Sequence, residues 1–202
     1  MSTPLGYFEQ MYAADPDPWS FESRWYDNRK HALTVAALPR PRYRAAFEPG
    51  CSTGLLTARL APRCDALLAV DAVESAVATT AQRLAGEPHV TVARARMPYD
   101  WPGRKFDLIV LSELGYYFDD TDLDALLAQA VVALEPGGDL VAAHWRRPVA
   151  EHARSGDEVH ERIAATGGLE LTAQHVEADF LLEVYARTPP AARSVAEREG
   201  LC

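Results

Sequence analysis

The feature that most limits how this chain can fold is a glycine-containing turn between an apolar run and a helical run. Residues 44–48 are predicted to form a strand and residues 53–62 a helix, with Gly50 in the turn and Gly54 at the helix start. This order is typical of a nucleotide site at the carboxyl end of a parallel sheet. Gly50 lets the backbone turn sharply, and Gly54 is expected to let the helix start approach a ligand, because a Cβ would occupy that space.

Apolar, β-rich runs alternate with helical segments along the chain, which predicts an α/β fold with a mostly parallel sheet. Strands are expected at 44–48, 66–71, 90–93, 106–111, 139–145, 169–177 and 180–187. Helices are expected at 5–15, 25–38, 53–62, 72–84, 122–134 and 157–166, with the helix at 122–134 capped by Thr121 or Asp122 and closed by residues 136–138. The last two strands lie close together in sequence and are expected to be antiparallel, whereas the strand order does not follow from periodicity.

Composition excludes several classes of function. The net charge of −9 makes nucleic acid a poor partner. The three cysteines form no ligand or disulfide framework, so no structural metal is predicted and a reducing cytoplasm is expected. No signal peptide is evident, and the apolar runs are far shorter than the roughly 18 residues of a membrane helix. The sequence leaves the oligomeric state open.

The spacing of the turn separates two chemistries. A dinucleotide site of the pattern G-x-G-x-x-G would need glycine at 52 and 55, where the chain has Ser52 and Leu55. An acid followed by glycine two and six residues later is typical of S-adenosylmethionine sites, and Glu48, Gly50 and Gly54 satisfy that pattern with Ser52 replacing a frequent glycine. An ordinary strand-to-helix turn remains the alternative.

Asp71 strengthens the nucleotide interpretation. It ends an apolar strand 17 residues after Gly54 (71 − 54), close to the spacing of about 20 at which an acid meets the two hydroxyls of a ribose. A carboxylate can accept hydrogen bonds from both hydroxyls. The alternative is a solvated aspartate at a strand end.

Further motifs accompany the turn at residues 15–19, 25–30, 106–117 and 136–145. With these motifs the chain resembles class I S-adenosylmethionine methyltransferases over roughly residues 7–187. More narrowly, it resembles the nodulation protein S family, rhizobial N-methyltransferases that act on a deacetylated chitooligosaccharide.

The resemblance implies a Rossmann-like single domain with a seven-stranded, mostly parallel sheet, an antiparallel last strand and helices on both faces. It also implies an N-terminal helical lid at 1–38, an S-adenosylmethionine-binding α/β domain at 39–188, and a tail at 189–202 that we expect to be disordered. The implied cofactor is S-adenosylmethionine, with S-adenosylhomocysteine as its product.

The expected cofactor residues follow from the turn, the strand ends and the resemblance. They are Glu48, Gly50, Cys51, Ser52, Gly54, Asp71, Ala72, Arg96, Met97, Ser112 and Arg29. Arg29 is assigned to the cofactor carboxylate, because arginine offers it a planar fork. No acid follows the third strand, so adenine is expected to be held by backbone groups near Arg96 and by apolar contact with Met97.

The expected catalytic residues are Glu113, which could orient an ammonium or act as a base, and His144, whose ordinary pKa suits base work. Their alternatives are a carboxylate that holds the cofactor amino group or caps a helix, and a structural histidine. No role is assigned to the other five histidines. The expected walls of the substrate pocket are Trp19, Trp25, Tyr26, Tyr116 and Tyr117.

The leading hypothesis is methyl transfer to a small-molecule amine, with amino sugars among the candidates. A small-molecule O-methyltransferase of secondary metabolism and a non-catalytic cofactor-binding regulatory domain are the alternatives. A dehydrogenase is disfavoured by Ser52 and Leu55.

Overall fold

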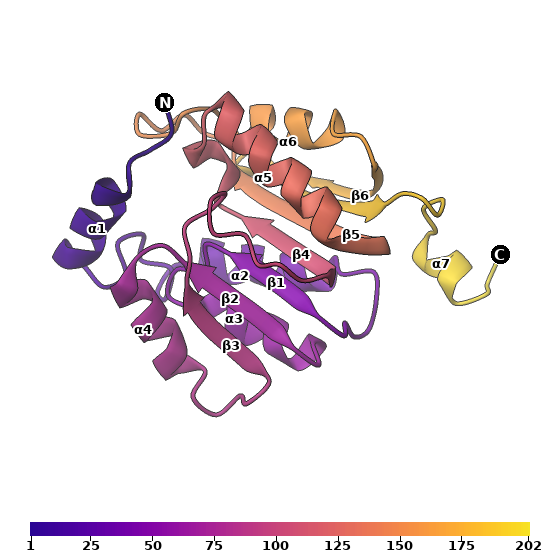
Figure 1. Ribbon diagram of the computed structural model, residues 1–202, viewed down its shortest axis with the longest axis horizontal. Helices are drawn as coiled ribbons and strands as arrows, with labels where there is room; N and C mark the ends of the chain where they lie inside the picture. Colours follow the sequence, from indigo (N-terminus) through magenta and orange to yellow (C-terminus); the bar gives the residue numbers. More distant parts are fainter.

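A seven-stranded sheet forms the centre of the protein, whose computed structural model describes residues 1–202 (Figure 1). The strand order is β3-β2-β1-β4-β5-β7-β6. The strands are β1 (Ala46–Pro49), β2 (Leu67–Asp71), β3 (Val90–Arg94), β4 (Phe106–Ser112), β5 (Leu134–Trp145), β6 (Leu169–Val176) and β7 (Phe180–Arg187).

β7, the last strand along the chain, is antiparallel to both of its neighbours, β5 and β6, whereas β1 to β5 pair in parallel. The predicted fold class is therefore confirmed. The chain runs outward from β1 through β2 to β3 and then returns to place β4 on the other side of β1. This reversal opens a crevice at the carboxyl ends of β1 and β4, where ligands bind in open α/β sheets.

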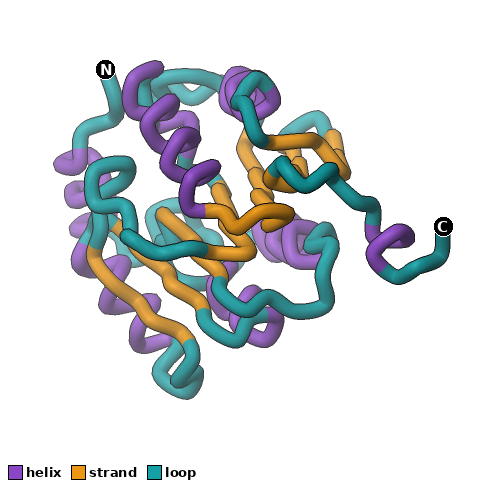
Figure 2. The backbone as a smooth tube through the Cα atoms, turned by 45° about the vertical axis from the view of Figure 1, so that its right-hand side comes forward, coloured by secondary structure: helices purple, strands orange, loops and turns teal.

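Helices cover both faces of the sheet, as Figure 2 shows with the strands lying between helices. The longer helices are α1 (Leu5–Ala14), α2 (Trp25–Ala36), α3 (Leu55–Leu60), α4 (Glu74–Arg83), α5 (Asp120–Ala133) and α6 (Gly156–Ala164). The short ones are η1 (Ala61–Arg63), η2 (Gly115–Tyr117) and α7 (Val195–Arg198).

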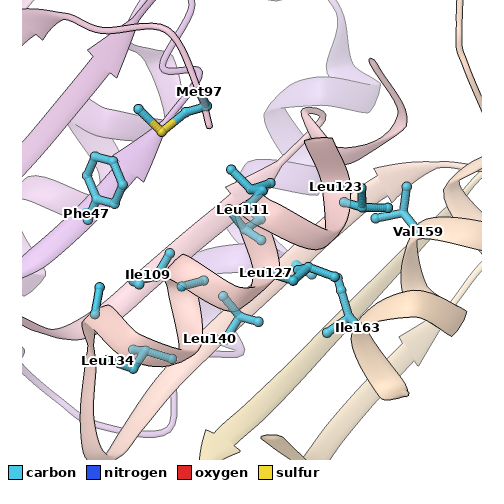
Figure 3. Packing of buried hydrophobic residues seen from close by; sticks show 14 of the residues in the cluster. Phe47, Met97, Ile109, Leu111, Leu123, Leu127, Leu134, Leu140, Val159 and Ile163 are labelled. Atoms are coloured by element: carbon cyan, nitrogen blue, oxygen red, sulfur yellow. The ribbon is translucent and has the colours of Figure 1, made fainter. Parts of the chain in front are cut away.

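β4 shows why both faces are apolar. Its successive side chains point to opposite faces, so Ile109 and Leu111 join the core under α5 and α6, while Leu108 and Val110 join the core under α2 and α3. Figure 3 shows the first of these cores, with Ile109 and Leu111 among side chains of α5 and α6. A central strand buried on both faces reads as a continuous apolar run, which is what the sequence displays.

Three local expectations differ from the structure. The N-cap of α5 is Asp119, whose side chain accepts from the Asp122 N–H at 3.1 Å, rather than Thr121 or Asp122. β5 begins at Leu134, directly after α5, rather than at residue 139. The segment 189–202, for which disorder was expected, contains α7, and Arg198 pairs with Asp139 at 3.0 Å. A capping box at Ser194 and Glu197 favours this short helix.

No helix combines the length and the apolar character that crossing a membrane requires.

Candidate active site

A cavity of about 640 Å³ lies at the carboxyl ends of β1, β2, β4 and β5 and is covered by residues of the N-terminal segment. Most residues expected to hold the cofactor line it: Glu48, Gly50, Cys51, Ser52, Asp71, Ala72, Arg96, Met97 and Ser112. Glu113 and the expected pocket residues Trp19, Tyr26, Tyr116 and Tyr117 line it as well. Gly54, Arg29, Trp25 and His144 do not.

The glycine turn is built from left-handed backbone. Gly50, Ser52 and Gly54 have φ angles of 75°, 52° and 78°. The N–H groups of Gly50 and Cys51 both donate to the Val70 carbonyl, at 2.7 and 2.9 Å, which ties the turn to the end of β2. Ser52 therefore adopts a conformation that favours glycine, and its backbone is held there by its neighbours.

Gly54 has a different role from the one expected. A Cβ at this position would lie 2.8 Å from Cγ2 of Thr80 on α4 and does not face the cavity. The glycine is needed because α4 packs tightly against the start of α3, and Oγ1 of Thr80 donates to the Ser52 carbonyl at 2.7 Å. Gly54 thus shapes the turn through helix packing rather than through ligand contact.

Asp71 joins the turn to the end of β2. Its carboxylate accepts the N–H of Ser52 and the N–H of Val73, both at 3.0 Å. Burial raises the pKa of this carboxyl, and these N–H groups oppose the shift. Each carboxylate oxygen keeps a further lone pair that can accept a hydrogen bond from a ligand in the cavity.

Glu48 lines the same cavity with a buried carboxyl group. Its side chain is buried and Oε2 has no hydrogen-bond partner. Burial raises the pKa of this carboxyl to about 8. Buried polar atoms without partners are uncommon in folded proteins, so Glu48 is well placed to meet a polar group of a bound molecule.

The backbone of Arg96 is already engaged. Its N–H donates to the Asp100 carboxylate and its carbonyl accepts the Asp100 N–H, both at 2.9 Å. The Arg96 N–H is therefore not free for adenine, whereas its carbonyl keeps a second lone pair, and the expectation that backbone groups near Arg96 hold adenine stays a prediction. Met97 remains as an apolar contact, since it is buried in the cavity wall.

Aromatic side chains of the N-terminal segment close the cavity. Tyr12 and Trp19 meet edge to face at 5.6 Å, and Trp19 stacks on Phe21 at 5.5 Å. The hydroxyl of Tyr12 lies 2.7 Å from Oγ of Ser52, which fastens α1 to the glycine turn. Trp25, by contrast, is 74% exposed and forms no part of the pocket, which corrects its predicted role.

A buried charge cluster lies at the other end of the cavity. Nζ of Lys30 is 2.7 Å from Oε1 of Glu113 and 3.1 Å from Oδ1 of Asp27. Oε2 of Glu113 accepts the Tyr116 hydroxyl and, at 3.1 Å, the Trp145 N–H. Burial alone would raise the pKa of Glu113, but Lys30 and these donors hold it below its ordinary value. Glu113 is thus a fixed anion and a weak base.

Arg29 does not reach the cavity, contrary to the expected contact with a cofactor carboxylate. Its guanidinium pairs with Glu177 at 2.7 Å on the outer side of α2. The buried positions of that helix are Asp27, Lys30, His31 and Thr34, whose spacing is that of one helical face. The structure therefore places Lys30, and not Arg29, on the buried face, and because this face is polar no apolar periodicity marked it in the sequence.

His144 is a structural histidine, which corrects its predicted catalytic role. It is completely buried and does not line the cavity. Its Nε2 accepts the Gly115 N–H at 3.1 Å, and its Nδ1 lies 3.1 Å from Nε2 of His160, whose Nδ1 lies 2.6 Å from Glu183. Because both ring nitrogens are engaged, neither can take a proton from a substrate.

Sequence reasoning missed several ionisable residues of the cavity wall, among them Arg24, His31 and His152. His31 lies on the polar buried face of α2, which no apolar pattern marked. Arg24 and His152 lie outside regular elements, so no periodicity marked them. No group of three or more His, Cys, Asp or Glu side chains is arranged to hold a metal ion.

Comparisons with known proteins identify the family of this chain. The family model described as Nodulation protein S (NodS) matches residues 7–162. Nodulation protein S of Rhizobium tropici is 31% identical over 64% of this chain and 55% of its own length. The Sinorhizobium fredii protein is 31% identical over 63% of this chain and 60% of its own length. The chain thus matches little more than half of these two curated relatives.

Solved structures include a NodS N-methyltransferase from Bradyrhizobium japonicum in complex with S-adenosylhomocysteine. It is 25% identical, with a TM-score of 0.81 over 90% of this chain and 97% of that one. A protein of Pseudomonas syringae, assigned as a methyltransferase, is 49% identical, with a TM-score of 0.73 over 81% of this chain and 100% of that one. With the family model covering most of the chain, this protein belongs to the Nodulation protein S family.

Proposed function

We propose that the protein transfers a methyl group from S-adenosylmethionine to the amine of a small molecule. One observation carries the proposal: a single cavity is lined by the buried Glu48 carboxyl and by Asp71 at one end, and by the Glu113 anion at the other. The first end suits a nucleoside with an attached amino acid. The second end suits a nitrogen nucleophile, and the solved family member carries the name N-methyltransferase.

The residues at the end of the cavity that is lined by Glu48 and Asp71 fit S-adenosylmethionine. The free lone pairs of Asp71 can accept from the ribose hydroxyls. The Glu48 carboxyl lines the cavity, and the positive charge of the cofactor's amino group would favour its ionised form, which can accept from that group. Met97 offers an apolar surface to adenine. Arg24 lines the cavity and is the cation available for a carboxylate, because Lys30 is already held between two carboxylates.

When bound, the cofactor supplies a methyl group that its sulfonium makes electrophilic. The protein must then align a nucleophile with that group and keep water out. Tyr26, Trp145 and Val149 form apolar walls beside Glu113. Oε1 of Glu113 accepts one hydrogen bond, from Lys30, and so keeps a lone pair that can orient an acceptor N–H.

Two measurements test the proposal. Calorimetry with S-adenosylhomocysteine and with NAD should show binding of the first only. A screen with methyl-labelled S-adenosylmethionine should then show transfer to an amine within a panel of deacetylated chitooligosaccharides, simple amines and phenols. Failure to bind S-adenosylhomocysteine at millimolar concentration would overturn the cofactor assignment. Transfer only to phenols would indicate O-methylation, and binding without any transfer would indicate a regulatory domain.

A further inference from the structure

His152 is a titratable side chain of the cavity to which neither the fold nor the proposed cofactor site gives a role. It belongs to the segment between β5 and α6, is half-buried, and lines the cavity. Its ring stacks on Tyr116 with the centroids 3.8 Å apart and the planes 11° apart, and meets Tyr117 edge to face at 4.9 Å. Stacking fixes the ring plane, while neither ring nitrogen has a hydrogen-bond partner within the chain.

The segment that carries His152 is anchored at several points. The Ala153 N–H donates to the Tyr116 carbonyl at 2.9 Å, and the His152 N–H donates to the Val149 carbonyl at 3.2 Å. The hydroxyl of Thr3 donates to the Glu151 carbonyl at 2.9 Å. His152 is therefore held beside Tyr116, whose hydroxyl binds the Glu113 anion.

We propose that the His152 imidazole is the general base that takes the proton of the acceptor nitrogen. This inference rests on the proposed function and deepens it. The acceptor ammonium gives one proton to a ring nitrogen and becomes a neutral amine. Its lone pair then forms the N–CH₃ bond while the S–CH₃ bond breaks, and that bond's electron pair stays on sulfur. The imidazolium passes its proton to water, which half-exposure of the side chain permits.

The other titratable groups in or near this end of the cavity are unsuited to the role. Asp27 pairs with Lys30, and Asp179 pairs with Arg147. Glu113 is held as an anion by Lys30 and two further donors. Burial raises the pKa of Tyr116 and Tyr117 well above the ordinary tyrosine range, so both stay protonated. His144 uses both ring nitrogens inside the core.

His31 is the nearest competitor, and its surroundings argue against it. Burial, with Lys30 and Arg59 nearby, lowers its pKa to about 4, which makes it a weak base. For His152, burial lowers the pKa while the Glu113 and Glu151 carboxylates oppose the shift. His152 is thus neutral at physiological pH and lies beside anions that stabilise its protonated form.

Variants of His152 separate proton transfer from packing. His152→Phe keeps a ring over Tyr116 but removes both nitrogens, and His152→Ala removes the ring. With the amine of highest turnover from the panel above, both variants should lose about 10²-fold or more in kcat at pH 7. Affinity for S-adenosylhomocysteine should stay within twofold. The matched control, His175→Gln on β6 outside the cavity, should behave as the wild type.

The pH profile gives the decisive readout. The acid limb of kcat/KM in the wild type should reflect the lowered pKa of His152, whereas in both variants it should follow the pKa of the free amine. The deficit of the variants should therefore shrink at alkaline pH, where the free amine is neutral. In histidine NMR spectra, the resonance lost in His152→Phe should titrate below the ordinary histidine pKa. If His152→Phe kept the kcat and the acid limb of the wild type, the role of His152 would be overturned, while the methyltransferase proposal would stand. Absence of transfer to every amine by the wild type would overturn both.

Discussion

At the scale of single residues, Lys30 determines the charge of the substrate end of the cavity. Its ammonium is almost completely buried and lies between the carboxylates of Glu113 and Asp27. Burial alone would lower its pKa, but the two carboxylates raise it above the ordinary lysine value. Lys30 is therefore held as a cation and Glu113 as an anion, and removing the lysine would leave the carboxylates of Glu113 and Asp27 without their counter-ion.

Lys30→Met should destabilise the protein by roughly 3 kcal/mol, because a buried ion pair that loses one partner leaves an uncompensated charge. Arg29→Gln removes a partly exposed pair on the same helix and should cost less than about 1 kcal/mol. Chemical unfolding of the two variants measures the difference, and equal losses would show that the Lys30 cluster is not desolvated as described.

Lys30 and Arg29 also show where the sequence-based prediction failed. The motif at 25–30 indicated a functional cation, but chemistry alone favoured Arg29, while the structure places Lys30 on the buried face. His144 was misjudged because a histidine at a strand end can face the site or the core, and only the structure shows His160 beside it. Glu48, Asp71 and Glu113 were found because each lies at or just after the carboxyl end of a strand whose apolar run marks that end.

Asp71 provides a second test at this scale. Asp71→Ala should weaken S-adenosylhomocysteine binding by at least ~1.5 kcal/mol, since both the ligand contact and the anchor for the Ser52 N–H are lost. Glu74→Ala, an exposed acid nearby on α4, is the control and should bind as the wild type. Calorimetric affinity of Asp71→Ala equal to that of the control would remove Asp71 from the site.

At the scale of elements, the fit between α3 and α4 sets the shape of the glycine turn. Gly54→Ala should destabilise the protein by about 1–3 kcal/mol, because a Cβ would lie 2.8 Å from Cγ2 of Thr80 and the backbone is left-handed. Thr80→Ser removes that methyl group and keeps the hydroxyl that donates to the Ser52 carbonyl. The double variant should therefore lose less than the sum of the two single losses.

Gly86→Ala is the matched control, because nothing lies within 4 Å of a Cβ built there. Thermal or urea unfolding of the four variants completes the comparison. Strict additivity of Gly54→Ala and Thr80→Ser would show that the strain is confined to the backbone of Gly54.

Element positions were largely predictable, whereas their arrangement was not. Strands such as β4 are marked by a continuous apolar run, which burial on both faces requires. The order of the strands depends on contacts between distant segments, so periodicity did not predict it, and the family resemblance implied only seven strands with an antiparallel last one. The cap of α5 was misplaced because Asp119, Asp120, Thr121 and Asp122 are all acceptable capping residues, and only the backbone geometry distinguishes them.

At the scale of the whole molecule, buried titratable groups act on stability in opposite directions. Burial raises the pKa of Glu48 from 4.5 to about 8, so the folded protein binds more protons and stability falls as pH rises through that window. Burial lowers the pKa of His31 from 6.5 to about 4 and that of His144 well below 6.5. These histidines make stability fall as pH drops below 6.5.

The free energy of unfolding should therefore reach its maximum near pH 6.5. Below this pH the histidines make stability rise with pH, and above it Glu48 makes stability fall. Between pH 6.5 and about 8 the wild type should lose roughly 1.4 kcal/mol per pH unit, the value for one proton. Glu48→Gln should flatten that alkaline slope, and His144→Gln should reduce the acid slope only. Urea unfolding from pH 5 to 8 measures all three profiles. Glu48 lines the cavity, so solvent in the cavity could lower its pKa. If the wild-type and Glu48→Gln profiles stayed parallel above pH 6.5, this carboxyl would be solvated, and its burial as described would be wrong.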